Sequence, residues 1–386
     1  MFSVMDNTII YICAPANVAT GGPEALHHLC YFLNESGYHA KMVYDSNSKS
    51  PIHENYKKYN NQFVKLNNVI DNANNVLLVP ESYPYPYYLN LFKHIQKSIW
   101  WLSVDWSLAF ESQKLITVNG NSDENYWVNN LLRGIRKKLT SFINCQSKCK
   151  IILSQIKNEI TTAKRELFIN NILFINNIKH YDYRDTCIVN LCQSYYAYDY
   201  VKNKLGADKV SLLFEPLGKE YLDFQKEHRY IPSAIIKKEN WVIYNPRKGF
   251  EYTKLIIKDA PEIKFIPIEN MTNDDIINLL NKAKVYIDFG PFPGSDRLPR
   301  QAACCGCCII TGRFGAANYY GDVKIDDAYK FSHPEENIKE IVSKIHECID
   351  NYDVKILDFE SEREKVLNEE KIFLEHIKNV FIKEEK

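Results

Sequence analysis

The stretch VYIDFGPFPGSDRLPRQAACCGCCIIT, at residues 285–311, contains the pattern that decides the fold. An apolar run typical of a β-strand covers residues 285–289, and a second run covers residues 308–311. Between them lie a loop rich in glycine and proline and a predicted helix at residues 298–305. Strand, helix and strand in this order, with short connections, indicate a β-α-β unit of a parallel sheet.

The same alternation continues on both sides of this stretch. Further apolar runs predict strands at residues 8–13, 40–44, 75–80, 98–105, 187–192, 210–214, 241–245 and 263–267. Helices are expected at residues 23–36, 195–205, 252–258 and 273–284, over about ten residues between 80 and 98, and twice in the charged tail at 334–386.

We therefore expect an α/β protein with two Rossmann-like β-α-β domains. The first spans residues 1–225, with a mostly helical insert at about 125–180, and the second spans residues 226–386. Parallel sheets bind ligands outside the carboxyl ends of their strands, so two such sheets predict a binding site in a central cleft.

Composition excludes several classes of function. The 386 residues contain 48 Lys and Arg and 48 Asp and Glu, and zero net charge argues against a general nucleic-acid binder. No apolar run reaches the roughly 18 residues that span a bilayer, and residues 1–7 lack the features of a signal peptide. We expect a cytoplasmic protein whose 11 cysteines are thiols.

Four of those cysteines stand in the run CCGCC at residues 304–308, which raises the question of a metal site. The paired Cys-x-x-Cys spacing and second ligand pair of a zinc site are missing. Packing explains them better, because free cysteine behaves as a small apolar residue where a helix turns into a buried strand. We predict no metal site.

Two loops at strand ends have residues suited to an anion, and each has a second interpretation. In NVATGGPE, residues 17–24, the glycines Gly21 and Gly22 allow close approach of a ligand to a helix N-terminus, or simply form a tight turn. In YNPRKG, residues 244–249, Arg247 and Lys248 could neutralise a diphosphate, although Pro-x-x-Gly is also typical of a solvated turn.

The loop before the predicted helix at 298–305 indicates an anion site more strongly. Ser295 or Asp296 is expected to cap this helix, and Arg297 and Arg300 stand at its N-terminus. Helix amides and two guanidinium groups together suit a phosphate or a sugar carboxylate.

Carboxylates at strand ends are the candidates for proton transfer. Asp105 ends the run at 98–105, where it could accept a proton from an acceptor hydroxyl, hold a sugar hydroxyl or cap the next segment. Glu81, which follows the run at 75–80, is the second candidate, and Glu24 is the third.

A basic segment, LLRGIRKKL at residues 131–139, alternates cations with apolar residues. Such a helix is able to lie on an anionic membrane surface. The alternative is a solvated helix whose apolar side packs on the first domain, and both interpretations are open.

Several of these segments resemble bacterial glycosyltransferases of the GT-B type, of the family 1/4-like, surface-polysaccharide kind. The GGPE turn at 21–24 and the helix ending in ESGYH at 35–39 are similar to the family's opening segment. NPRKG at 245–249 resembles a shortened donor-phosphate segment, residues 273–288 resemble the helix and strand before the donor site, and PRQAACCG at 299–306 resembles its Pro-x-x-Glu-Ala segment. The resemblance runs in order from residue 8 to about residue 311.

The resemblance implies a metal-independent enzyme without a cofactor, which transfers a sugar from a nucleotide-sugar donor to a glycan or lipid-linked acceptor. It implies acceptor binding by the first half, donor binding by the second, and final helices that cross back to the first domain. A role in surface polysaccharide or lipooligosaccharide assembly, at the inner face of the cytoplasmic membrane, would follow. The expected donor-binding residues are Gly21, Gly22, Arg247, Lys248, Gly294, Ser295, Asp296, Arg297, Arg300 and Gln301.

One residue departs from the family pattern. Gln301 stands where retaining members have a glutamate that contacts the donor ribose, and the earlier glutamate of the pair has no counterpart here. A neutral amide still hydrogen-bonds a hydroxyl. Two other functions are compatible with the pattern: a nucleotide-sugar epimerase of the same fold, or a partner of this fold that binds without catalysis.

Overall fold

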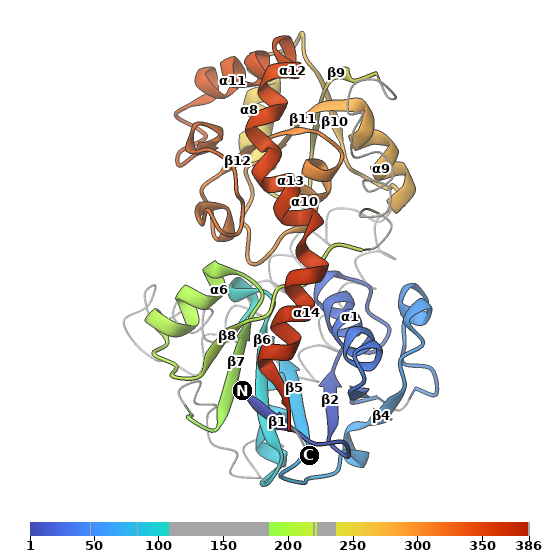
Figure 1. Ribbon diagram of the computed structural model, residues 1–386. Coiled ribbons are helices and arrows are strands. Elements are labelled where there is room, and N and C mark those ends of the chain that lie inside the picture. Colours follow the sequence, from blue (N-terminus) through green and yellow to red (C-terminus); the bar gives the residue numbers. More distant parts are fainter. Residues whose placement is uncertain (47, 83, 108–184, 219–220, 222–236, 385–386) are drawn as a thin grey trace, which may run out of the picture. The chain divides into compact units, whose positions relative to one another are not determined.

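Two parallel β-sheets form the framework of the chain (Figure 1). The computed structural model describes residues 1–46, 48–82, 84–107, 185–218, 221 and 237–384. The expected domain boundary at 225/226, the insert at 125–180 and the basic segment at 131–139 lie outside these residues.

The N-terminal sheet has seven strands in the order β4-β3-β2-β5-β6-β7-β8, and every neighbouring pair is parallel. Its first connection is the helix α1 (Gly21–Glu35), which buries Leu26, Leu29 and Leu33. The chain moves from β2 to β3 and β4 on one side and then crosses to β5 on the other. The strands are β2 (Ile9–Cys13), β3 (His39–Tyr44), β4 (Phe63–Lys65), β5 (Val76–Pro80), β6 (Gln96–Trp101), β7 (Ile188–Cys192) and β8 (Val210–Leu212).

The C-terminal sheet repeats this plan with five parallel strands in the order β10-β9-β11-β12-β13. The cysteines at 304–308 are buried here, in agreement with a packing role. The strands are β9 (Glu239–Tyr244), β10 (Lys264–Pro267), β11 (Ala283–Asp288), β12 (Cys308–Gly312) and β13 (Lys330–Phe331), and the helices are α8 (Phe250–Asp259), α9 (Asn273–Lys282) and α10 (Arg297–Cys304).

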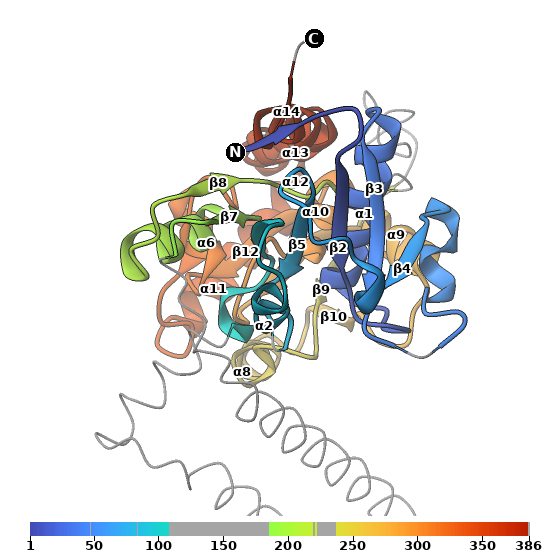
Figure 2. The same cartoon turned by 90° about the horizontal axis from the view of Figure 1, so that it is seen from below.

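The C-terminal tail returns to the N-terminal sheet. After α11 (Ile338–Asp350), α12 (Tyr352–Lys355) and α13 (Glu360–Leu367), α14 (Glu369–Val380) lies along one face of this sheet (Figures 1 and 2). The ring of Phe373 on α14 packs 5.5 Å from that of Phe32 and 6.5 Å from that of Trp100. Beyond it, β14 (Phe381–Lys383) pairs in parallel with β1 (Phe2–Val4).

Three local expectations differ from the structure. The helix expected between residues 80 and 98 is only the short α2 (Tyr85–Tyr88), with Pro84 at its N-cap and Pro86 in its first turn, followed by a 3-10 turn. The strand expected to reach residue 105 ends at Trp101, and Asp105 belongs to a 3-10 turn, Val104–Trp106. The tail contains four helices where two were expected.

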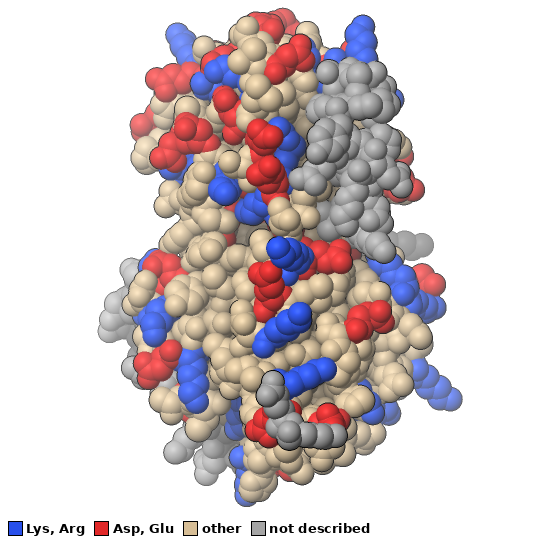
Figure 3. All heavy atoms as spheres, in the orientation of Figure 1, with Lys and Arg blue, Asp and Glu red and all other residues tan. Residues whose placement is uncertain are grey.

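None of the helices in the described part of the chain combines the length and the hydrophobicity needed to cross a membrane. On the face in Figure 3, acidic and basic side chains are interspersed, as expected for a chain with zero net charge.

Candidate functional site

Residues from both sheets line one pocket of about 630 Å³. Pro15 follows β2 and Glu81 follows β5. Between these two neighbouring strands the strand order of the N-terminal sheet reverses. Asn245 follows β9, and residues 293–297 follow β11, at the corresponding point of the C-terminal sheet. Open α/β sheets bind ligands at such points, so the pocket is the candidate active site.

The N-terminus of α10 opens onto this pocket. Gly294, Ser295, Asp296 and Arg297 all line it, and the first backbone N–H groups of a helix favour an anion. Gly294 is required for close packing, because a Cβ atom there would lie 2.1 Å from the carbonyl oxygen of Leu102.

Arg297 forms an ion pair with Glu24 of α1. Burial lowers the pKa of Arg297, but the carboxylates of Glu24 and Glu215 outweigh burial and raise it overall. Gly21 leaves room for this guanidinium, since a Cβ atom on Gly21 would lie 3.3 Å from Nη2 of Arg297. Gly21 and Gly22 both line the pocket, as expected for a ligand-facing turn.

Lys248 lines the pocket within a cluster of carboxylates. Its Nζ donates to Oδ2 of Asp296 at 2.9 Å and lies 3.4 Å from Oδ2 of Asp288. Burial lowers the pKa of Lys248, but these two carboxylates outweigh it and hold the pKa above its usual value. Burial raises the pKa of Asp296 to about 6. Arg247, in contrast, is exposed and is not among the residues that line the pocket.

Arg300 and Gln301 are buried behind the pocket wall. Nη1 of Arg300 donates to Oε2 of Glu369 at 2.7 Å and to the carbonyl oxygen of Glu215 at 3.0 Å, and Nη2 donates to the carbonyl oxygen of Ser295 at 3.1 Å. Arg300 therefore joins α10 to α14 and to the segment after β8. Neither Arg300 nor Gln301 lines the pocket.

The three candidate carboxylates have different surroundings. Glu81 lines the pocket, and its two oxygens accept hydrogen bonds from the backbone N–H groups of Leu102 at 3.0 Å and Ser103 at 3.1 Å. Burial raises the pKa of Glu81 to about 7, although these hydrogen bonds oppose the shift. Asp105 is half-buried, accepts a hydrogen bond from the Tyr196 hydroxyl at 3.0 Å, and is not a lining residue. Glu24 is engaged by Arg297.

The lining residues that were not predicted include Gln193, Glu215 and Trp106. Gln193 follows β7 and Glu215 follows the segment after β8, so the rule of polar residues at strand ends would have found both. Trp106 is 69% exposed and lines the pocket next to Ser103. The sequence indicates its neighbour Asp105 as a carboxylate at a strand end, but an isolated tryptophan belongs to no motif that predicts a binding site.

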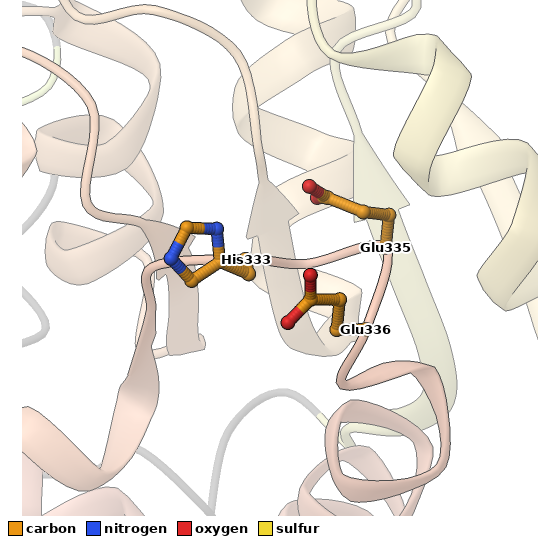
Figure 4. A group of neighbouring side chains, drawn as sticks. All are labelled: His333, Glu335 and Glu336. Carbon is orange, nitrogen blue, oxygen red and sulfur yellow. The ribbon is translucent and has the colours of Figure 1, made fainter.

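Within the described residues, one group of three side chains has metal-ligand spacing: His333, Glu335 and Glu336 (Figure 4). All three are exposed, lie before α11 and are not among the lining residues of the pocket. An exposed acidic cluster of this kind does not by itself make a metal site.

Comparisons with known proteins support the fold. No family model matches the sequence, and no curated protein matches it. Sucrose-phosphate synthase from Thermosynechococcus elongatus matches with a TM-score of 0.56 at 10% identity, over 97% of this chain and 98% of that chain. Anabaena HepE in complex with UDP-glucose matches with a TM-score of 0.52 at 9% identity, over 97% of this chain and 99% of that chain. Such low identity establishes the fold alone, and the chain has the two-sheet GT-B architecture that its sequence resembles.

Proposed function

We propose that the protein is a glycosyltransferase that moves a sugar from a nucleotide-sugar donor to a hydroxyl group of a glycan or lipid-linked acceptor. The observation that carries this proposal is that one pocket is lined by residues from both sheets, at the points where the strand order of each sheet reverses. Arg297, at the N-terminus of α10, is part of its wall. HepE, which shares the architecture, has been crystallised with UDP-glucose, and this supports a nucleotide-sugar ligand.

The donor diphosphate would bind at the N-terminus of α10. Arg297 and the helix amides supply positive charge where negative charge develops on the leaving group. Lys248 lies nearby, and the carboxylates of Asp288 and Asp296 beside it neutralise part of its positive charge. We propose that these groups replace a metal ion and that the enzyme needs no cofactor, since the sequence contains no Asp-x-Asp pair to hold a divalent ion on a diphosphate.

In the transfer, the acceptor oxygen forms a bond to the anomeric carbon while the bond from that carbon to the diphosphate oxygen breaks. The electron pair of the broken bond leaves with the nucleoside diphosphate, and the acceptor proton passes to a base. Glu81 is our choice for this base, because it lines the pocket and has a pKa of about 7. Asp105, bonded to Tyr196 and outside the lining, stays a prediction.

The acceptor would bind to the first half of the chain, residues 1–225, and the donor to residues 226–386. An acceptor from surface polysaccharide or lipooligosaccharide assembly would place the enzyme at the inner face of the cytoplasmic membrane. This part of the proposal rests on the sequence resemblance and on the basic segment at 131–139.

A donor screen tests the proposal. Thermal shift with UDP-, GDP-, dTDP- and CMP-sugars should give a raised Tm for one nucleotide family, because a ligand that binds only the folded state stabilises it. Arg297→Ala should lose this shift, whereas Glu262→Gln, a change at an exposed residue outside the pocket, should retain it. Release of a changed sugar nucleotide without any acceptor would indicate an epimerase, and no shift with any donor would contradict the proposal.

A further inference from the structure

Two buried polar side chains line the pocket and have no role in the mechanism above. Glu215 is 4% exposed and lies just beyond β8, and Gln193 is 6% exposed and follows β7. Both belong to the pocket lining. A buried carboxylate is costly unless hydrogen-bond donors satisfy it, so the partners of Glu215 are informative.

Only one oxygen of this carboxylate accepts a hydrogen bond within the described structure. Oε2 of Glu215 accepts from Nε2 of Gln193 at 3.0 Å. Nδ1 of His28 lies 3.8 Å from Oε1, too far for a hydrogen bond, and this nitrogen has no hydrogen-bond partner among the described residues. Oε1 of Glu215 is thus available to a hydroxyl group from a ligand in the pocket.

The carboxylate lies beside the loop that would hold the diphosphate. Nη2 of Arg300 lies 3.9 Å from Oε2 of Glu215 and donates to the carbonyl oxygen of Ser295 at 3.1 Å, which places this carboxylate next to Ser295. The charge of Glu215 also acts on Arg297. A diphosphate bound at Arg297 has the nucleoside on one side and the sugar on the other. The nucleoside is proposed to bind to the second half of the chain and Glu215 lies just beyond β8 of the N-terminal sheet, so the sugar is the group that would lie within reach of Glu215.

We propose that Glu215 and Gln193 recognise hydroxyl groups of the transferred sugar. Oε1 of Glu215 accepts a hydrogen bond from one ring hydroxyl, and the amide of Gln193 orients the carboxylate and bonds a neighbouring hydroxyl. The inference rests on the proposed function and specifies the donor class. The donor sugar has the ring hydroxyl that bonds Oε1 of Glu215, and the deoxy analogue that lacks this hydroxyl should bind poorly. A site built to bond a hydroxyl discriminates strongly against a ligand that lacks it.

The test compares free nucleotide with nucleotide sugar by isothermal titration calorimetry. The probes are UDP with UDP-glucose and with UDP-2-deoxyglucose, GDP with GDP-mannose, and dTDP with dTDP-glucose. The quantity measured is the ratio of the Kd of the nucleotide to the Kd of its sugar form. In Glu215→Gln this ratio should fall about 10- to 100-fold, because a charge-assisted hydrogen bond to the sugar is lost.

Three controls isolate the effect. The free nucleotide should bind Glu215→Gln at least as tightly as wild type, because the removed charge also acts on Arg297, and this binding shows that the pocket is folded. Gln193→Met keeps the length of the side chain and removes its amide, so the ratio should fall by less. Glu262→Gln makes the same chemical change at an exposed position and should leave the ratio unchanged.

Each other outcome overturns a defined statement. An unchanged ratio in Glu215→Gln, equal loss of affinity for nucleotide and sugar form, or a wild type that binds both forms equally would overturn this inference and leave the proposed function standing. A wild type that binds none of the nucleotides or nucleotide sugars would overturn the proposed function, and the inference with it.

Discussion

The guanidinium group of Arg297, at the start of α10, is held by the carboxylate of Glu24 on α1. This ion pair joins residues from the two halves of the chain beside the pocket, at the position proposed for the donor diphosphate. A diphosphate and Glu24 would therefore compete for the same cation.

The competition predicts opposite effects for two substitutions. Arg297→Ala should weaken donor binding by roughly 1–3 kcal/mol, the range for a charged hydrogen bond. Glu24→Gln should strengthen it by about 0.5–1 kcal/mol, because a partly exposed ion pair no longer competes with the ligand. Calorimetry on both variants, with circular dichroism to confirm folding, checks the prediction. Unchanged donor affinity in a folded Arg297→Ala protein would remove this residue from the site.

Arg300 is expected to act on stability, because its guanidinium is buried and bonded to Glu369. Arg300→Leu leaves that carboxylate buried without its partner and should lower the free energy of unfolding by about 3–5 kcal/mol. In Arg300→Leu combined with Glu369→Leu part of the loss should return, since Glu369 no longer leaves an unpaired charge. The rest should persist, because Glu215, whose Oε2 lies 3.9 Å from Nη2 of Arg300, also loses its partner. Urea unfolding measures both. A stable Arg300→Leu protein with impaired donor binding would instead support the direct contact that the sequence predicts.

Glu81 should give the reaction a pH dependence. Its pKa of about 7 means that kcat/KM should rise with pH and level off above about 7, where the base is ionised. Glu81→Gln should reduce kcat about 10²- to 10⁴-fold and remove this rise. Asp105→Asn is the matched comparison, and a larger loss there than in Glu81→Gln would assign the base to Asp105.

The same residue should affect stability in the opposite direction. Burial raises the pKa of Glu81 from 4.5 to about 7, so its charged form is disfavoured in the folded state. The contribution of Glu81 to the free energy of unfolding is fully present below about pH 4.5. It falls by up to about 3 kcal/mol as the pH rises through 7. The Glu81→Gln variant should therefore become more stable relative to wild type as the pH rises from about 4.5 to 7. A constant difference from pH 4.5 to 7.5 would contradict the raised pKa.

Metal removal should leave transfer activity intact. Arg297 and the N–H groups of α10 are proposed to stabilise the leaving diphosphate without a divalent ion. Activity measured after dialysis against EDTA should match that of untreated enzyme, and added Mg²⁺ or Mn²⁺ should not raise it. Complete loss with recovery on adding either ion would count against this mechanism.

The basic segment at 131–139 gives a membrane prediction. Each cation near an anionic surface contributes about 1 kcal/mol, and salt weakens this attraction steeply. Co-sedimentation with anionic liposomes should occur at low salt and disappear at high salt. Reversal of four charges should abolish it: Arg133, Arg136, Lys137 and Lys138. If the wild type stays in the supernatant, or if the variant still sediments, the segment is not a membrane contact and its packing role is favoured.

The sequence predicted those features that depend on neighbouring residues. Apolar runs with helices between them predicted both parallel sheets, and the loop before α10 led to Arg297. The burial of Arg300 could not be predicted from its sequence neighbours, because it depends on an ion pair with Glu369. This residue is 69 positions later in the chain and is brought to Arg300 by α14. The pairing of β1 with β14 likewise depends on a contact between chain ends, and strands of three residues carry too little pattern to be recognised.

The return of α14 has a consequence for biosynthesis. The core of the N-terminal sheet includes Phe373, Ile377, Val380 and Phe381. A ribosome therefore completes the first half of the chain long before it delivers the side chains that cover this half. During elongation the apolar surface around Trp100 stays uncovered and open to chaperones or to aggregation. Translation that stops before residue 369 would leave a nascent chain with most of its strands and an unfinished core, and such a product should be a substrate for proteolysis.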